Sequence, residues 1–229
     1  MRQHNINQQA LKQINSDIKL YSPQPSLVQV IAVTKKFNYT AINSAYQSKI
    51  TCIGENKVQE FLSKKKEIIE LENKIETHLI GHLQTNKVNK AVGFFDVIQT
   101  VDSLKIAEKI NKKAEEKNIK QKVYIQINIG KDPKKYGFDT EGLYKKIEEI
   151  TKKKQLKLKG LMTILPFEND VKFAQNLFAK MKKIQNKVIS SINPDCEFLS
   201  MGMSRDYIYA LKEGATHLRI GTKLYGQRP

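Results

Sequence analysis

The sequence alternates, eight times over, between a short run of branched apolar residues and a longer segment with helical periodicity. Each apolar run has the length and the β-branched content of a buried strand. The predicted strands cover residues 27–34, 49–53, 76–80, 95–100, 123–129, 158–164, 197–201 and 216–220. Strands that alternate with helices pair in parallel through right-handed crossovers, so the pattern predicts an α/β protein.

The segments between these runs carry apolar residues at intervals of three and four, which is typical of a helix with one buried face. The clearest such segment extends from Val171 to Val188, and shorter ones extend from Leu104 to Ala114 and from Val58 to Ile69. Asp102 and Asp139 precede helical segments and are predicted to be their N-caps, because a carboxylate there accepts free N–H groups.

Two arrangements fit eight such units: a doubly wound open sheet and a closed (β/α)8 TIM barrel. No G-x-G-x-x-G follows the first run, which weakens the dinucleotide-binding form of the open sheet. Eight units in a chain of 229 residues fit the compact end of the barrel range. We therefore expect residues 1–229 to form a single barrel domain. The apolar spacing over residues 6–18 predicts an extra helix before the first strand.

The formal charge of +17 first suggests a nucleic-acid partner. However, only four of the 40 cationic residues are arginine, the residue that such surfaces favour for its planar fork and its stacking. The lysines gather in helical stretches such as 64–66 and 152–154. We interpret them as solvated helix faces and expect no specific nucleic-acid partner. Non-specific attraction to polyanions is the alternative that composition leaves open.

Cysteine usage and hydropathy bear on the compartment. The two cysteines, Cys52 and Cys196, are too few for a disulfide framework and fit a reducing compartment. No apolar run approaches the roughly 20 residues of a membrane span. The first 20 residues lack the apolar core of a signal peptide. We expect a cytoplasmic protein that does not engage a membrane.

In a barrel, the chemistry takes place at the carboxyl ends of the strands, and phosphate often binds after strands seven and eight. Glycines and hydroxyls gather after those two runs. The glycines would let backbone N–H groups approach an anion, and the hydroxyls would add donors. The candidate phosphate ligands are Ser200, Gly202, Ser204, Gly221 and Thr222. Taken singly, the two glycines fit ordinary turns equally well.

Two neighbouring lysines, Lys35 and Lys36, follow the first predicted strand. A lysine in a barrel mouth is partly desolvated, which lowers its pKa and frees the amine as a nucleophile. A phosphate site that faces an amine is what pyridoxal 5′-phosphate (PLP) requires. We expect no metal site: His78 and His82 are four residues apart, but His78 falls within a strand and no third ligand is apparent nearby.

Five motifs in register, from residue 32 to residue 222, carry a family resemblance. They are Ala32–Lys35 (AVTK), Gly54–Glu60 (GENKVQE), His78–Lys87 (HLIGHLQTNK), Ser200–Ser204 (SMGMS) and Arg219–Thr222 (RIGT). Together they resemble the PLP homeostasis proteins, which are similar to the N-terminal domain of alanine racemase. One departure is visible, since the family often has a proline soon after the lysine and residues 36–39 have none. That departure concerns the shape of this loop.

The resemblance implies a role for each matching position. Lys35, not Lys36, would form a Schiff base with PLP, Arg219 would face the pyridine nitrogen, and Asn56 would lie near the ring. The phosphate would be held by Ser200, Gly202, Gly221 and Thr222, with help from Ser204. A guanidinium cannot accept the proton of the pyridine nitrogen, so carbanion stabilisation would be modest.

The same resemblance implies a protein that carries or buffers PLP in vitamin B6 and amino- or keto-acid homeostasis, with apo-enzymes as candidate partners. Racemases of this type use a tyrosine from a second, β-rich domain. Because the chain ends at Pro229, soon after the eighth run, we expect no such domain, no catalytic set of its own and a monomer. An amino-acid racemase or another weak PLP enzyme is the alternative, with a local residue such as Tyr136 as second base.

Overall fold

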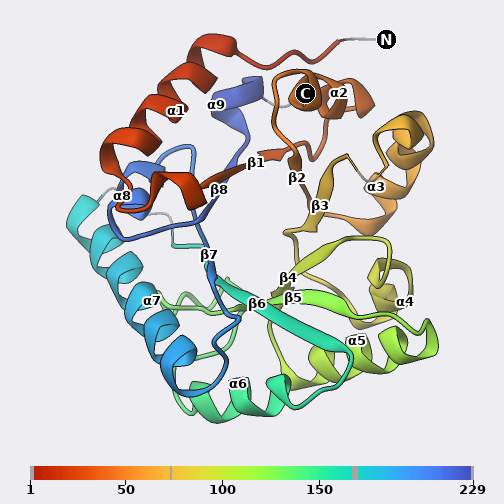
Figure 1. Ribbon diagram of the computed structural model, residues 1–229, viewed down its shortest axis with the longest axis vertical. Helices are drawn as coiled ribbons and strands as arrows, with labels where there is room; N and C mark the ends of the chain where they lie inside the picture. The colour runs from red at the N-terminus through yellow and green to blue at the C-terminus, as the bar shows by residue number, and fades with distance from the viewer. Residues whose placement is uncertain (1–2, 73, 167–169, 228–229) are drawn as a thin grey trace.

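The computed structural model describes residues 3–72, 74–166 and 170–227, and its strands close into a parallel barrel (Figure 1). The barrel closes because β1 pairs with β8, with Gln29 opposite His217. The strands are β1 (Gln29–Val33), β2 (Cys52–Glu55), β3 (Glu76–Leu79), β4 (Val97–Val101), β5 (Gln121–Gln126), β6 (Leu156–Met162), β7 (Phe198–Met203) and β8 (His217–Ile220). Each overlaps one predicted strand, so the predicted (β/α)8 TIM barrel is confirmed.

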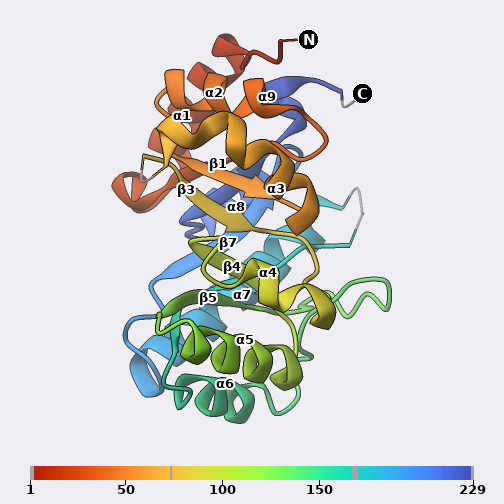
Figure 2. The same ribbon diagram turned by 90° about the vertical axis from the view of Figure 1, so that its right-hand side faces the viewer.

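Helices surround the barrel, as the two perpendicular views show (Figures 1 and 2). The α-helices are α1 (Gln8–Tyr21), α2 (Tyr39–Gln47), α3 (Val58–Lys65), α4 (Val88–Ala91), α5 (Leu104–Glu116), α6 (Leu143–Thr151), α7 (Val171–Ser191), α8 (Tyr207–Lys212) and α9 (Thr222–Tyr225). Short 3-10 turns are η1 (Pro25–Leu27), η2 (Lys66–Leu71) and η3 (Thr85–Lys87). The periodic segments of the sequence therefore form the outer layer.

The extra helix predicted before the first strand is α1. Its N-cap is Asn7, whose side chain accepts the N–H of Ala10 at 3.0 Å. The backbone N–H of Asn7 also donates to the carbonyl of Leu224 at 2.8 Å, so α1 starts beside α9. Buried Ile14 and Ile18 pack toward the barrel, and the Tyr207 hydroxyl of α8 donates to a buried carboxylate of α1. This helix from the start of the chain therefore contacts α8 and α9, which come from its last part.

Both predicted aspartate N-caps are wrong. Ser103 caps α5, with its hydroxyl accepting the N–H of Ile106 at 3.2 Å, while Asp102 lies 2.8 Å from the ring of His82. Asp139 accepts from the N–H of residue 141 within a turn, and α6 starts later, after Gly142 at φ +63°. Asp102 is thus held by a tertiary contact and Asp139 by a local turn, and neither carboxylate caps a helix.

The strands bury different chemistry on their two faces. The faces toward the helices are apolar and belong to one continuous core. Inside the barrel a smaller apolar cluster, Val97, Tyr124 and Met162, occupies only part of the space. Polar side chains fill much of the remainder, and all of them are buried: His78, Gln99, Ser200, His217 and Arg219. A polar barrel interior leads directly to the carboxyl ends of the strands.

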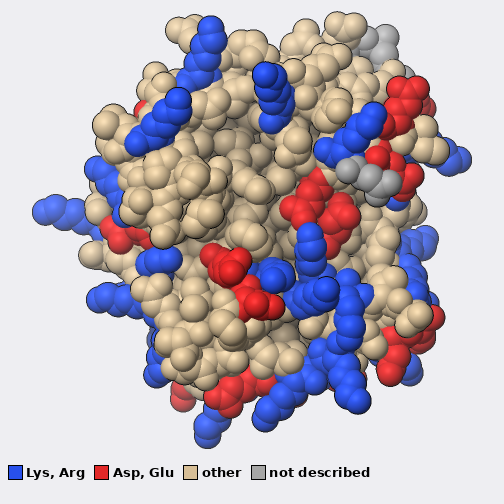
Figure 3. All heavy atoms as spheres, in the orientation of Figure 1, with Lys and Arg blue, Asp and Glu red and all other residues tan. Residues whose placement is uncertain are grey.

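Charge is spread over the surface rather than gathered in one groove on the face that Figure 3 shows. Lysine and arginine side chains project around most of this face and are densest at its lower right, while aspartate and glutamate form small groups both near its centre and at its edge (Figure 3). This distribution agrees with the interpretation of solvated lysine faces. Within the described ranges, the structure contains no helix long and apolar enough to cross a membrane.

Candidate functional site

A cavity of about 800 Å³ opens where the strands end. It gathers residues that lie far apart in the sequence, because the loops after β1, β2, β6, β7 and β8 all border it. Six of the eight predicted site residues line it: Lys35, Asn56, Ser204, Arg219, Gly221 and Thr222. The pairing of Ala32 with Ile220 brings the loop of Lys35 next to the loop of Gly221. The cavity thus places an amine and a candidate phosphate cradle side by side.

Ser200 and Gly202 do not line this cavity; they lie buried below it. The Ser200 hydroxyl donates to Gln99 Oε1 at 2.7 Å and accepts from Arg219 at 2.8 Å. Gly202 has φ +89°, and a Cβ there would lie 2.6 Å from the Cβ of Ala210. The structure therefore gives these two residues packing and support contacts, not contacts with the cavity.

Arg219 lies at the base of the cavity with its charge almost fully buried. One guanidinium nitrogen donates to Ser200 Oγ at 2.8 Å, and the other donates to the carbonyl oxygen of Thr163 at 2.6 Å. Burial lowers the pKa of Arg219 to about 10, against an opposing effect of Asp206. The side chain therefore remains a cation at neutral pH and presents a fixed donor face.

A chain of hydrogen bonds extends from Arg219 through the barrel interior. Ser200 leads to Gln99, and Gln99 Nε2 lies 2.8 Å from His78 Nδ1. His78 Nε2 in turn lies 3.1 Å from Glu76 Oε2, at the other end of β3. Because β4 and β7 are not neighbours, the bond from Gln99 to Ser200 crosses the interior. Sequence reasoning missed Gln99, since neither periodicity nor motif reports a contact between distant strands.

Beneath Lys35, a buried ionic cluster fixes the end of β1. Lys64 donates to Glu55 Oε1 at 2.8 Å and to the carbonyl oxygen of Thr34 at 3.0 Å. The Thr34 hydroxyl donates to the same Glu55 oxygen at 2.7 Å. Burial raises the pKa of Glu55, and the ammonium of Lys64 opposes that rise. Because Thr34 directly precedes Lys35, this cluster fixes the backbone position of Lys35.

In the loop that lacks the expected proline, a residue with positive φ and its hydrogen bond fix the backbone conformation. Lys36 adopts φ +65°, and its backbone N–H donates to a carboxylate oxygen of Glu60. Glu60 is also held by Lys64 at 2.8 Å. A left-handed residue tied to α3 therefore turns the chain where the family often has proline. Lys35 and Lys36 consequently differ, since Lys35 lines the cavity and Lys36 does not.

Asn56 reaches the cavity because Gly81 leaves room for it. A Cβ on Gly81 would lie 2.2 Å from the carbonyl oxygen of Asn56, which no side chain tolerates. The Gly81 carbonyl accepts from the Thr100 hydroxyl at 2.8 Å, so the end of β3 is also anchored to β4. Close packing of these two loops sets Asn56 at the rim. Gly81 stands in the sequence motif, but the motif alone does not reveal this role.

The lining of the cavity carries more positive than negative side chains. Of the charged residues that line the cavity, Lys35, Lys135, Arg205, Arg219 and Lys223 outnumber Asp170 and Asp206. Ser204 Oγ accepts the N–H of Lys223 at 3.2 Å, which ties the loop after β7 to α9. Such a surface attracts an anion.

Three histidines, His78, His82 and His217, lie in different surroundings. His82 lies at the surface, where it contacts Asp102 and stacks on Tyr136 with ring centroids 3.6 Å apart. His78 lies inside the barrel, so the two do not form a pair. His217, which has no obvious sequence partner, is buried and bonded through Nδ1 to Thr216 Oγ1 at 2.9 Å. Its pKa falls to about 3, chiefly because burial disfavours the imidazolium.

Comparison with known proteins identifies the relatives of this chain. The family model for the alanine racemase N-terminal domain matches residues 6–229. A pyridoxal phosphate homeostasis protein of Aquifex aeolicus (strain VF5) is 36% identical over 200 residues, with 87% of each chain covered.

Solved structures agree with this relationship. PipY of Synechococcus elongatus PCC7942, solved with PLP bound, is 36% identical with a TM-score of 0.82, covering 93% of this chain and 100% of that chain. An alanine racemase of Clostridium difficile 630 is 18% identical with a TM-score of 0.77, covering 99% of this chain and 62% of that chain. The latter match shows the shared barrel fold alone.

Proposed function

The chain belongs to the pyridoxal phosphate homeostasis proteins, which have the alanine racemase N-terminal domain, and from this premise we propose that it binds PLP through Lys35 and carries it. The observation that supports this proposal best is the cavity that Lys35 shares with Arg219 and Thr222. A lysine amine, a fixed cation and hydroxyl donors are the groups that an aldehyde, a pyridine nitrogen and a phosphate require.

In this proposal, different residues of the cavity bind different parts of PLP. Lys35 supplies the amine, and the buried cluster of Lys64, Glu55 and Thr34 holds its backbone in place. Ser204, Thr222 and the backbone at Gly221 bind the phosphate, and the cationic surroundings favour its charge. Asn56 borders the ring. Ser200 and Gly202 act indirectly, through Arg219 and through the packing of α8.

Arg219 is the reason to propose a carrier rather than an efficient catalyst. When bound, PLP supplies an electron sink, whose strength depends on a protonated ring nitrogen. A guanidinium that already donates to Ser200 and Thr163 cannot accept a proton from that nitrogen. Buffering or delivery of the cofactor to apo-enzymes fits this chemistry best. The carrier that we propose acts as a cytoplasmic monomer.

The test of the binding site compares two adjacent lysines. Titration of the protein with PLP should produce the visible absorption band of a lysine adduct. Lys35→Ala should abolish the band, and the matched control Lys36→Ala should retain it. A band that persists in Lys35→Ala contradicts the assignment.

A weak racemase is the second candidate, and one observation favours it: Tyr209 lines the cavity that contains Lys35. A tyrosine opposite a lysine amine is a potential second base. The protein loaded with PLP should be incubated with L-alanine in deuterium oxide. Slow or absent α-proton exchange supports the carrier. Sustained exchange at enzyme-like rates that is lost in Tyr209→Phe supports the racemase instead.

A further inference from the structure

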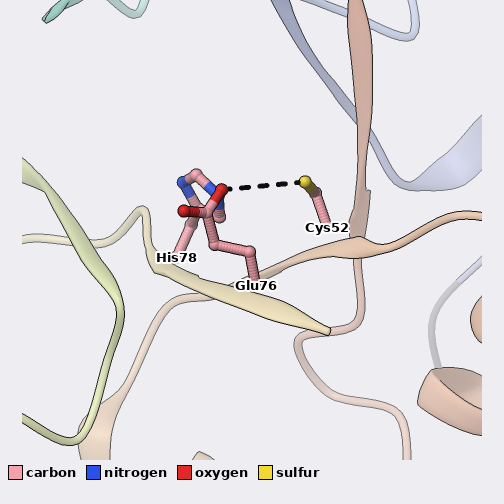
Figure 4. Close-up of side chains that lie close together, drawn as sticks. All are labelled: Cys52, Glu76 and His78. Carbon is pink, nitrogen blue, oxygen red and sulfur yellow. Dashed lines mark hydrogen bonds and ion pairs between the residues drawn. The ribbon is translucent and has the colours of Figure 1, made fainter. Parts of the chain in front are cut away.

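A second group of chemically reactive side chains lies where β2 and β3 begin, away from the cavity of Lys35. Glu76 and His78 project from β3, and Cys52 projects toward them from β2 (Figure 4). The Cys52 sulfur, a carboxylate oxygen of Glu76 and a ring nitrogen of His78 all lie within 4.8 Å of one another. We propose that these three residues bind a divalent metal ion of the zinc class.

The distances suit a tetrahedral ion. The carboxylate oxygen Oε2 of Glu76 lies 4.0 Å from the Cys52 sulfur and 3.1 Å from His78 Nε2. Ligands of tetrahedral zinc, at bond lengths of about 2.0–2.3 Å, lie about 3.3–3.6 Å apart. The two observed separations bracket this range. Cys52 and Glu76 are direct partners in the β2–β3 register, so the backbone holds these two ligands at fixed positions.

The ligand types point to the same class of metal. A thiolate, an imidazole and a carboxylate form a mixed set that zinc and cobalt accept, whereas magnesium and calcium prefer oxygen alone. Gln29 Oε1 lies 3.1 Å from the Cys52 sulfur, so an amide oxygen or a water is available as fourth ligand. A cavity of about 340 Å³ that Gln29 and Cys52 both line offers access from solvent.

The groups around the three ligands support them. Lys122 donates to the second carboxylate oxygen of Glu76 at 2.8 Å and so holds the carboxylate in place. Gln99 Nε2 lies 2.8 Å from the other ring nitrogen of His78, so the Gln99 amide is within reach of a second-sphere role.

Binding requires a defined proton exchange. A thiol binds a metal ion as the thiolate, so the incoming ion must displace the thiol proton of Cys52, which leaves to solvent. The imidazole keeps one proton, which moves from Nε2 to Nδ1. The Gln99 amide then turns so that its Oε1 accepts from that N–H, and its Nε2 donates to the Ser200 hydroxyl, which no longer donates to Gln99. One proton is released for each ion bound, so affinity rises with pH.

Cobalt(II) titration of the full-length protein tests the proposal directly, with difference spectra that cancel any cofactor absorption. We expect a thiolate-to-cobalt charge-transfer band that saturates at one ion per chain. Cys52→Ser should abolish that band. Cys196→Ser is the matched control, because Cys196 is the other buried cysteine and lies outside the cluster, and it should retain the band.

A second measurement separates lost binding from lost folding. Excess zinc should raise the melting temperature of the wild type and of Cys196→Ser, because the ion binds only the folded state. Glu76→Gln, which is nearly isosteric, should fold and lose most of this shift, and Gln99→Ala should weaken zinc affinity by about 10–100-fold. Absence of the charge-transfer band, or a band unchanged in Cys52→Ser, means that the cluster is only a hydrogen-bonded ion pair of Glu76 and Lys122.

Discussion

Arg219 retains its charge inside the barrel because acceptors reach it from two other strands. Ser200 of β7 and the carbonyl of Thr163, just after β6, fix both guanidinium nitrogens, and this geometry keeps the side chain aimed at the cavity. The buried charge is thereby compensated by hydrogen bonds, although it has no close ion pair among the described residues. The orientation of the guanidinium therefore depends on Ser200, which the sequence motifs predict to be a phosphate ligand.

The serine beneath Arg219 gives a prediction for a single hydroxyl. Ser200→Ala removes an acceptor from Arg219 and a donor from Gln99, so we expect it to lower the free energy of unfolding by about 1–3 kcal/mol. It should also weaken PLP binding without abolishing the lysine adduct. Urea denaturation and cofactor titration measure the two effects. Ser190→Ala, at an exposed serine on α7, should change neither, and equal losses in both variants would contradict the role.

Residues at strand ends could be predicted from the sequence, whereas residues that support them could not. Lys35 follows an apolar run, so the barrel places it at the mouth without further information. Lys64 and Gln99 have no such signal, because each acts through a contact that only the closed barrel creates. The position of a residue along a strand can be derived from its neighbours in the sequence. A contact across the barrel interior depends on the closed fold and cannot be derived in this way.

The junction of β7 with α8 shows how an element boundary shapes the site. The sequence predicts a strand over residues 197–201, but β7 continues to Met203 and includes Gly202. The N–H of Met203 donates to Asp206 at 2.6 Å, just before α8 begins. Gly202 allows this tight turn because it adopts φ +89° against the helix. The same turn delivers Ser204 to the cavity.

Two glycines with positive φ allow the cost of steric crowding to be distinguished from the cost of backbone strain. Gly226 has φ +76° with nothing near its missing Cβ, while Gly202 would crowd Ala210. We expect Gly226→Ala to cost about 1–2 kcal/mol from strain alone. Gly202→Ala should cost about 1–3 kcal/mol more, since overpacking adds to strain. Thermal and urea denaturation compare them, and equal costs would show that α8 does not press on Gly202.

Helix starts are the elements that sequence reasoning placed least well. Asp102 and Asp139 are good N-cap residues, yet Ser103 caps one helix and Gly142 precedes the other. Asp102 contacts His82 from the preceding loop, a tertiary contact that local propensity does not include. Helix faces, by contrast, follow the apolar spacing, because the same side chains must cover the barrel.

At the scale of the whole molecule, the eightfold alternation, the chain length and the missing G-x-G-x-x-G predict the closed barrel. The polarity of its interior was not predicted: His78, Gln99, His217 and Arg219 stand within the predicted strands, but the sequence alone does not show which face of each strand points inward. His217 belongs to this interior and has Tyr124 and His78 as ring neighbours. The molecule thus carries a buried neutral imidazole at its centre.

This imidazole makes the stability of the fold depend on pH. The pKa of His217 falls from an ordinary 6.5 to about 3 on folding, so the unfolded chain binds a proton that the folded chain excludes. Its stabilising effect is complete above pH 6.5 and declines toward pH 3. We expect a loss of about 2 kcal/mol between pH 7 and pH 5.

Urea denaturation at the two pH values, with a chelator present, measures this effect. His217→Asn should reduce the difference between pH 7 and pH 5 by about 2 kcal/mol. His4→Gln, at a partly exposed histidine, should retain it. An unchanged difference in His217→Asn would contradict the assignment.

The central claim, that Lys35 is the residue that carries the cofactor, has one direct measurement. The protein is loaded with PLP and reduced with borohydride, which makes the lysine adduct permanent, and peptide mass spectrometry then locates it. We predict stoichiometric modification of Lys35, with Lys36 unmodified in the same peptide. An adduct located on Lys36 or on another lysine, or no covalent adduct at saturating PLP, would disprove the assignment of Lys35.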